Sequence, residues 1–118
     1  MMKMKQISMA CAIAAATVFG GPAHAQISGD VIKLGIITDM SGRYSDIDGP
    51  AGVEAIKMAI ADSGGAINGK KVEVLVADHQ NKADVAAAKA REWFDTLGLD
   101  TLIGGTNSGT SLAMSKVA

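Results

Sequence analysis

The segment of this sequence best suited to chemistry is GGTNSGTS, residues 104–111. It matches a phosphate-binding loop at every position except Thr110, where that loop carries a lysine. Backbone N–H groups in such a loop, with the hydroxyls of Ser108 and Thr110, can hold an anion without the lysine. Neutral donors suit a singly charged carboxylate better than a nucleotide, so the segment predicts a carboxylate site. The alternative is a plain helix cap with glycines for close packing.

Hydrolysis is the second chemistry to consider for the same segment. A nucleophile elbow needs serine at the third of five positions, but in residues 105–109 that position is Asn107. Asp78, His79 and Ser108 could form a triad, yet adjacent side chains on a strand point to opposite faces, which disfavours Asp78 as the partner of His79. A secreted α/β serine hydrolase using Ser108 is therefore kept as the alternative function.

Composition and spacing argue against other functions. The formal net charge of -1 and the 3% aromatic content offer neither a basic surface nor a stacking platform, so we expect no nucleic-acid partner. After residue 25 there is one histidine and no cysteine, which argues against a zinc site. Residues 38–44 lack the G-x-G-x-x-G pattern of nicotinamide-binding folds. We expect no metal and no cofactor.

The elements that must position residues 104–111 alternate along the chain. Short apolar runs predict strands at 31–38, 71–78 and 101–103. Helical spacing follows each run: Val53, Ile56 and Ile60 before a Gly64-Gly65 stop, then residues 83–97 before a Gly98 cap, then a helix from Thr110. This order predicts an α/β fold with a parallel sheet and helices on both faces, whose ligand loops follow the carboxyl ends of the strands.

The first 25 residues have the pattern of a secretory signal peptide. Lys3 and Lys5 precede an apolar run at 7–19, and Ala23-His24-Ala25 is a typical cleavage site. The run is shorter than the roughly 20 residues of a membrane span. Export leaves residues 26–118 without cysteine in an oxidising compartment, which suits the bacterial periplasm.

Three strands and an interrupted third helix predict an incomplete domain. A sheet of this kind would leave an open edge and half a core. We therefore expect residues 26–118 to be the front part of a longer protein.

Several segments together resemble one known family: IKLG at 32–35, DMSG at 39–42, AINGKKV at 66–72, DHQN at 78–81 and the loop at 104–111. In order and spacing they are similar to the branched-chain amino-acid class of periplasmic substrate-binding proteins, type I, which serve ABC importers. The resemblance covers residues 30–118. It implies a two-lobed solute receptor, not an enzyme, with residues 26–118 as the N-terminal part of the first ligand-binding lobe.

The resemblance also implies which residues contact the ligand. Ser108 would offer its hydroxyl and backbone amides to a carboxylate, with Asn107 and Gly109 as neighbours. The loop after the first strand would line the cleft mouth with Ser41, Arg43 and Tyr44, although Arg43 stands where the family usually has proline. On the residues alone, Tyr44 is equally suited to a pocket wall or to loop packing.

Family members often join the loops after the second and third strands by a disulfide, and here those positions are Asn81 and Asn107. The resemblance therefore implies an amide contact between them. The expected ligand is a branched-chain or other amino acid, an amide or an aromatic acid. The expected partner is an ABC permease in the inner membrane, served by a monomeric receptor; a ligand-binding sensor domain of the same fold is a third possibility.

Overall fold

A four-stranded sheet organises the computed structural model, which describes residue 27 and residues 29–118. The strand order is β2-β3-β1-β4. Strands β1 (Val31–Thr38), β3 (Lys70–Asp78) and β4 (Thr101–Gly104) run parallel, and the short β2 (Ala66–Ile67) pairs antiparallel with β3. The three predicted strands are confirmed, while β2 was not expected. The predicted signal peptide, residues 1–25, lies outside the described residues.

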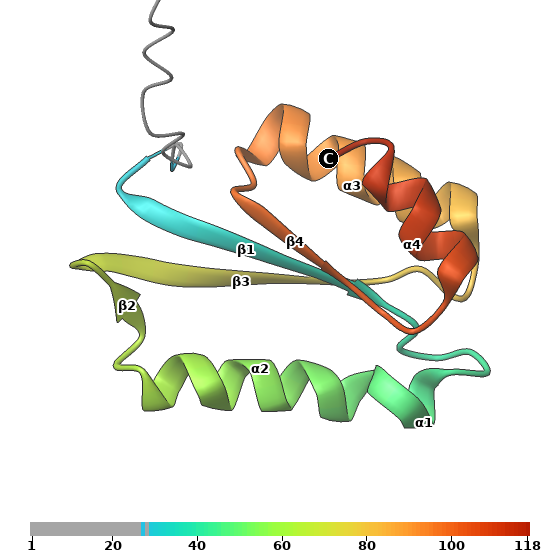
Figure 1. The fold of residues 1–118 in the computed structure, drawn as a ribbon, viewed down its shortest axis with the longest axis horizontal. Coiled ribbons are helices and arrows are strands. Elements are labelled where there is room, and N and C mark those ends of the chain that lie inside the picture. The colour runs from blue at the N-terminus through green and yellow to red at the C-terminus, as the bar shows by residue number, and fades with distance from the viewer. Residues whose placement is uncertain (1–26, 28) are drawn as a thin grey trace, which may run out of the picture.

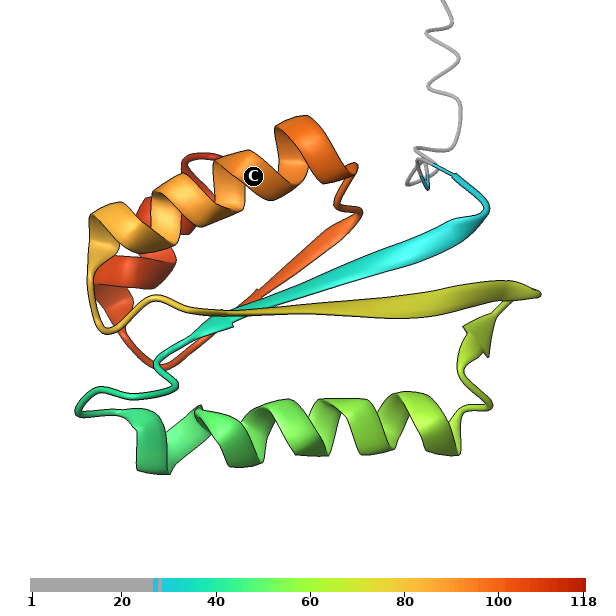
Figure 2. The same ribbon diagram turned by 180° about the vertical axis from the view of Figure 1, so that it is seen from behind.

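Four helices follow the strands. They are α1 (Ser45–Asp48), α2 (Pro50–Asp62), α3 (Ala83–Leu97) and α4 (Ser108–Ser115). Both views place α2 on one face of the sheet and α3 with α4 on the other (Figures 1 and 2). The predicted α/β fold with helices on both faces is therefore confirmed. Over residue 27 and residues 29–118, no helix has the length and apolar character to cross a bilayer.

The core lies between the sheet and α3, where Ile37, Ala86, Ala90, Trp93, Leu99 and Met114 are buried together. Gly35 lets α3 approach β1, because a Cβ there would lie 2.8 Å from Cε3 of Trp93. Substituting any larger residue would force the indole ring to move. Trp93 is thus a packing residue.

Two element boundaries differ from the sequence-based expectation. The segment after β1, for which no helix was expected, contains the single helical turn α1, and α4 begins at Ser108 rather than Thr110. The reason for the second difference is the cap: the Asn107 side chain accepts from the Thr110 N–H, so Ser108 and Gly109 already belong to the helix. The predicted cap at Gly98 is confirmed, with φ 63.

The strand register brings three loops to one edge of the sheet. Thr38 at the end of β1 lies opposite Asp78 at the end of β3, and Ile37 lies opposite Gly104 at the end of β4. The loops that follow these strands therefore start side by side. This is the edge at which α/β folds bind ligands.

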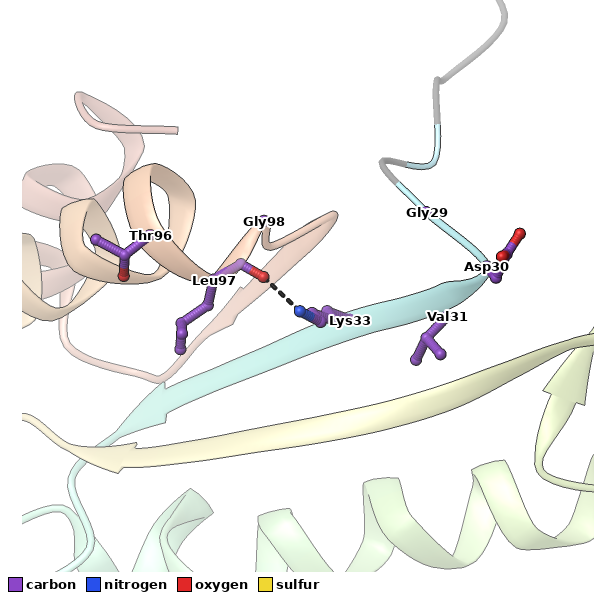
Figure 3. A pocket seen from close by; sticks show the side chains of 7 residues that line it. All are labelled: Gly29, Asp30, Val31, Lys33, Thr96, Leu97 and Gly98. Carbon is purple, nitrogen blue, oxygen red and sulfur yellow. Dashed lines mark hydrogen bonds between the residues drawn. The ribbon is translucent and has the colours of Figure 1, made fainter.

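The opposite edge carries the hollow shown in Figure 3. Lys33 Nζ donates to the carbonyl of Leu97 at 2.6 Å and so satisfies a terminal carbonyl of α3. The hollow, about 460 Å³, is lined by Gly29, Asp30, Val31, Lys33, Thr96, Leu97 and Gly98. None of these residues belongs to the three loops, so the hollow is separate from the predicted site.

Candidate carboxylate site at the carboxyl edge of the sheet

Asp39 shapes the loop after β1. Its carboxylate is 1% exposed and accepts from the backbone N–H of Gly42 at 2.7 Å and of Tyr44 at 3.0 Å. A Cβ on Gly42 would lie 2.5 Å from Asp39 Oδ1, so glycine is required there. The loop is therefore folded around a buried carboxylate, with Arg43 held between its two anchored neighbours.

Ser41 joins this loop to the end of β3. Its hydroxyl donates to Asp78 Oδ2 at 2.5 Å, and the Met40 N–H donates to Asp78 Oδ1 at 3.0 Å. Burial raises the pKa of Asp78, but hydrogen bonds from Ser41, Gln80 and Met40 outweigh it and hold that pKa below its usual value. The Ser41 hydroxyl is thus already engaged within the protein.

Arg43 and Tyr44 form a cation–π pair, with Arg43 Cζ 5.7 Å from the centroid of the Tyr44 ring. Arg43 is exposed and Tyr44 is half-buried. The Arg43 side chain is therefore stacked on the ring of its neighbour. The pair offers a positive charge and an aromatic surface next to Asp39 and Ser41.

The loop after β3 has an unusual backbone. Gln80 and Asn81 are consecutive non-glycine residues in the left-handed region, with φ 50 and φ 58. The Gln80 N–H donates to Asp78 Oδ1 at 2.7 Å, and the Asn81 N–H donates to His79 Nδ1 at 2.9 Å. Side chains from the end of β3 therefore hold both residues in place.

His79 is not arranged as a catalytic base. It is 1% exposed, its Nδ1 is used by Asn81, and its Nε2 is buried without a partner. Within the part of the chain that the structure describes, no hydrogen bond joins His79 to Asp78 or to Ser108. The triad considered from the sequence is not assembled in this arrangement.

The loop after β4 carries the donors for an anion. Asn107 Oδ1 accepts from the Thr110 N–H at 3.0 Å, and the Asn107 carbonyl accepts from the Ser111 N–H at 3.0 Å. The backbone N–H groups of Ser108 and Gly109 and the Ser108 hydroxyl have no partner among the described residues, and both residues are exposed. Two backbone N–H groups and a hydroxyl are thus available at the start of α4, where the helix dipole favours negative charge.

The loops after β3 and β4 contact each other through two amides. Asn107 Nδ2 donates to Asn81 Oδ1. The contact implied by the family's disulfide positions is confirmed. The structure thus brings Asn107, Ser108 and Gly109 together at the carboxyl edge, where Ser41 also anchors its loop to Asp78; their contact with a ligand stays a prediction.

Sequence reasoning missed Asp48, which joins α1 to the loop after β4. Its Oδ2 accepts from the Thr106 N–H at 2.7 Å. A Cβ on Gly105 would lie 2.5 Å from Thr38 Oγ1 and 2.7 Å from Asp48 Oδ2, so only glycine fits between them. In the sequence, Asp48 stands among acidic and small residues, and no motif there indicates a contact with Thr106.

Comparison with known proteins yields a family and a set of structural neighbours. The family model described as periplasmic binding protein matches residues 31–118. A periplasmic binding protein from Burkholderia mallei is 67% identical, with a TM-score of 0.74 over 75% of this chain and 24% of that chain. No curated protein matches.

Two further neighbours extend the comparison. A branched-chain amino acid ABC transporter periplasmic ligand-binding protein from Burkholderia xenovorans is 46% identical, with a TM-score of 0.67 over 72% of this chain and 23% of that chain. A solute binding protein of an ABC transporter from Rhodopseudomonas palustris, in complex with 3,4-dihydroxybenzoic acid, is 28% identical, with a TM-score of 0.71 over 76% of this chain and 24% of that chain. The chain thus spans about a quarter of the length of these structures.

Proposed function

The chain belongs to the periplasmic binding protein family, and on this basis we propose that it forms part of an extracytoplasmic solute receptor. The receptor binds a small carboxylate or amide-bearing ligand and delivers it to an ABC importer through a permease in the inner membrane. Residues 26–118 supply the first part of one ligand-binding lobe. The receptor works as a monomer after removal of residues 1–25.

The observation that carries this proposal is the set of unpaired donors at the start of α4. Ser108 and Gly109 are exposed, and among the described residues their two backbone N–H groups and the Ser108 hydroxyl have no partner. A ligand carboxylate would satisfy these donors and would be favoured by the helix dipole. Arg43 and Tyr44, as a stacked pair, add a positive charge and an aromatic face on the neighbouring loop.

The ligand class follows from the same donors. A single carboxylate is common to amino acids and to aromatic acids such as the 3,4-dihydroxybenzoic acid bound by the Rhodopseudomonas palustris protein. The name of the Burkholderia xenovorans protein points to branched-chain amino acids. We therefore propose a branched-chain or other amino acid, or an aromatic acid, with small amides as the uncharged variant that uses fewer donors.

A hybrid receptor tests the proposal. In it, residues 31–118 replace the matching segment of the 67% identical Burkholderia mallei protein, which supplies the rest of the chain. Thermal shift and calorimetry would screen leucine, isoleucine, valine, acetamide, urea, benzoate and 3,4-dihydroxybenzoate. If the hybrid binds none of these compounds, the proposal is contradicted. Hydrolysis of an ester substrate would favour the secreted hydrolase.

Ser108→Ala is the decisive variant. A hydrogen bond to a charged group contributes roughly 1.5–3 kcal/mol, so the hybrid variant should bind its acid about tenfold to a hundredfold more weakly. Ser115→Ala is the matched control, because Ser115 lies in the same helix and its hydroxyl donates to the Leu112 carbonyl at the other end. If Ser108→Ala and the unmodified hybrid bind the acid with equal affinity, Ser108 does not contact the ligand and is only a residue of the first turn of α4.

Export and lobe completion have tests of their own. Intact mass of periplasmic material should show a chain that begins at Gln26 and lacks Cys11.

In the described sheet, β4 is an edge strand. Residues 26–118 alone should therefore unfold without a sharp cooperative transition, because this edge and its neighbouring apolar surface are uncovered.

A further inference from the structure

We infer that Asn81 is a positioning residue for the carboxylate site, because its side-chain oxygen selects which end of the Asn107 amide caps α4. The inference rests on the proposed function of Ser108 and Gly109. It assigns to the loop after β3 a role in setting ligand affinity without ligand contact.

The first step concerns the two ends of the Asn107 side chain. An asparagine amide has an acceptor end and a donor end, and only the acceptor can cap a helix. Asn107 Oδ1 accepts from the Thr110 N–H at 3.0 Å, and Asn107 Nδ2 donates to Asn81 Oδ1. A flipped amide would set donor against donor at Thr110 and acceptor against acceptor at Asn81. Asn81 therefore disfavours the flipped orientation.

The second step concerns the amides that the cap leaves free. Thr110 and Ser111 direct their N–H groups back to Asn107, and the Thr110 hydroxyl donates to the Asn107 carbonyl at 2.9 Å. The N–H groups of Ser108 and Gly109 then remain for a ligand. If Asn107 turned away, the first turn of α4 would lose its cap, and these two amides would lose their fixed direction.

The third step concerns how Asn81 is itself held. Its left-handed backbone, φ 58, is fixed by the bond from its N–H to His79 Nδ1, and the Lys82 N–H donates to the His79 carbonyl at 2.8 Å. His79 is itself buried, with 1% of its surface exposed. Non-glycine residues in such a conformation persist where the surroundings determine it, and they concentrate at functional sites. Glycine would adopt this backbone freely but has no oxygen for Asn107.

Asn81→Gly in the hybrid receptor removes the oxygen and keeps the backbone. Asn68→Gly is the matched control, because Asn68 is also left-handed, φ 49, and lies in the turn between β2 and β3. For Asn81→Gly we expect amide hydrogen exchange at Thr110 to become at least about tenfold faster, because the cap is no longer held. Asn68→Gly should leave that rate unchanged. Equal exchange rates in both variants would overturn the inference.

Ligand affinity gives the second readout, with leucine or 3,4-dihydroxybenzoate as the probe, whichever the unmodified hybrid binds. Asn81→Gly should weaken binding by about tenfold. In an Asn107→Ser background it should have no further effect, because serine caps the helix with one oxygen and has no amide to orient. An undiminished effect in that background would contradict the inference. If the unmodified hybrid binds none of the screened compounds, the proposed function loses support, while the exchange rates still decide the role of Asn81.

Discussion

The turn at Asn68–Gly69 and the turn at Gln80–Asn81 use left-handed backbone in two different ways. The first joins β2 to β3, with φ 49 and φ 79, and a Cβ on Gly69 would meet nothing within 4 Å. The second contains no glycine and depends on the side chains of Asp78 and His79. One turn reverses the chain, and the other directs a side chain at a neighbouring loop.

This difference shows two ways to encode an uncommon conformation. An Asn-Gly pair adopts it from local preference, because glycine has no Cβ to clash. Gln80 and Asn81 adopt it because acceptors on the preceding strand end take their N–H groups. A substitution in the Asn68–Gly69 turn should therefore affect stability only. A substitution that disturbs the Gln80–Asn81 turn should also alter ligand affinity at the carboxylate site.

The largest expected effect is that of His79→Ala. The substitution empties a fully buried site and removes the acceptor for the Asn81 N–H, so the free energy of unfolding of the hybrid receptor should fall by about 3 kcal/mol. Affinity should fall as well, because Asn81 loses its anchor. Denaturant unfolding and calorimetry measure the two quantities.

His79→Asn is the control for this prediction. Its side-chain oxygen can replace Nδ1 as the acceptor, so part of the stability and most of the affinity should return. If His79→Ala lowered stability but left affinity untouched, the two turns would not differ in the way described.

Gly69→Ala should have a smaller effect that is confined to stability. Because a Cβ at Gly69 has open space, the cost is that of a left-handed alanine, about 1 kcal/mol. Ligand affinity should not change, since the turn lies at the end of β3 away from the carboxyl edge. A drop in affinity measured by calorimetry would show that this turn also communicates with the site.

The smallest effect is expected for Asp78→Asn, and it depends on pH. The pKa of Asp78 is lowered in the folded protein, so its carboxylate contributes stability that is fully present above the unfolded-state pKa and is lost as pH falls through the folded pKa. Near neutral pH the variant should be less stable by about 0.5 kcal/mol, because the Met40 and Gln80 N–H groups then donate to a neutral oxygen and the Ser41 hydroxyl faces an amide nitrogen, at a position that is partly in solvent. The free energies of unfolding of Asp78→Asn and the unmodified hybrid, measured from about pH 6 down to about pH 2, should converge in acid. A constant difference over this range would refute the assignment.

Regular elements were predictable from the sequence because their signals are local. The apolar runs at 31–38 and 71–78 and the helical spacing of 83–97 matched strands and a helix within a residue. Gly98 marked the end of its helix because glycine enters the left-handed region without strain. The short β2 was not predicted, because a strand of two residues shows no hydrophobic periodicity.

The arrangement of the site needed the tertiary structure. From the residues alone, Ser108 and Gly109 could be assigned to an anion-binding segment, because glycine and hydroxyl donors between a strand and a helix have few other uses. The bonds of Ser41 to Asp78, of Asp48 to Thr106 and of Asn107 to Asn81 join residues from 26 to 58 positions apart. Such pairs form only after parallel strands bring their carboxyl ends to one edge, and no local preference of either partner specifies the other.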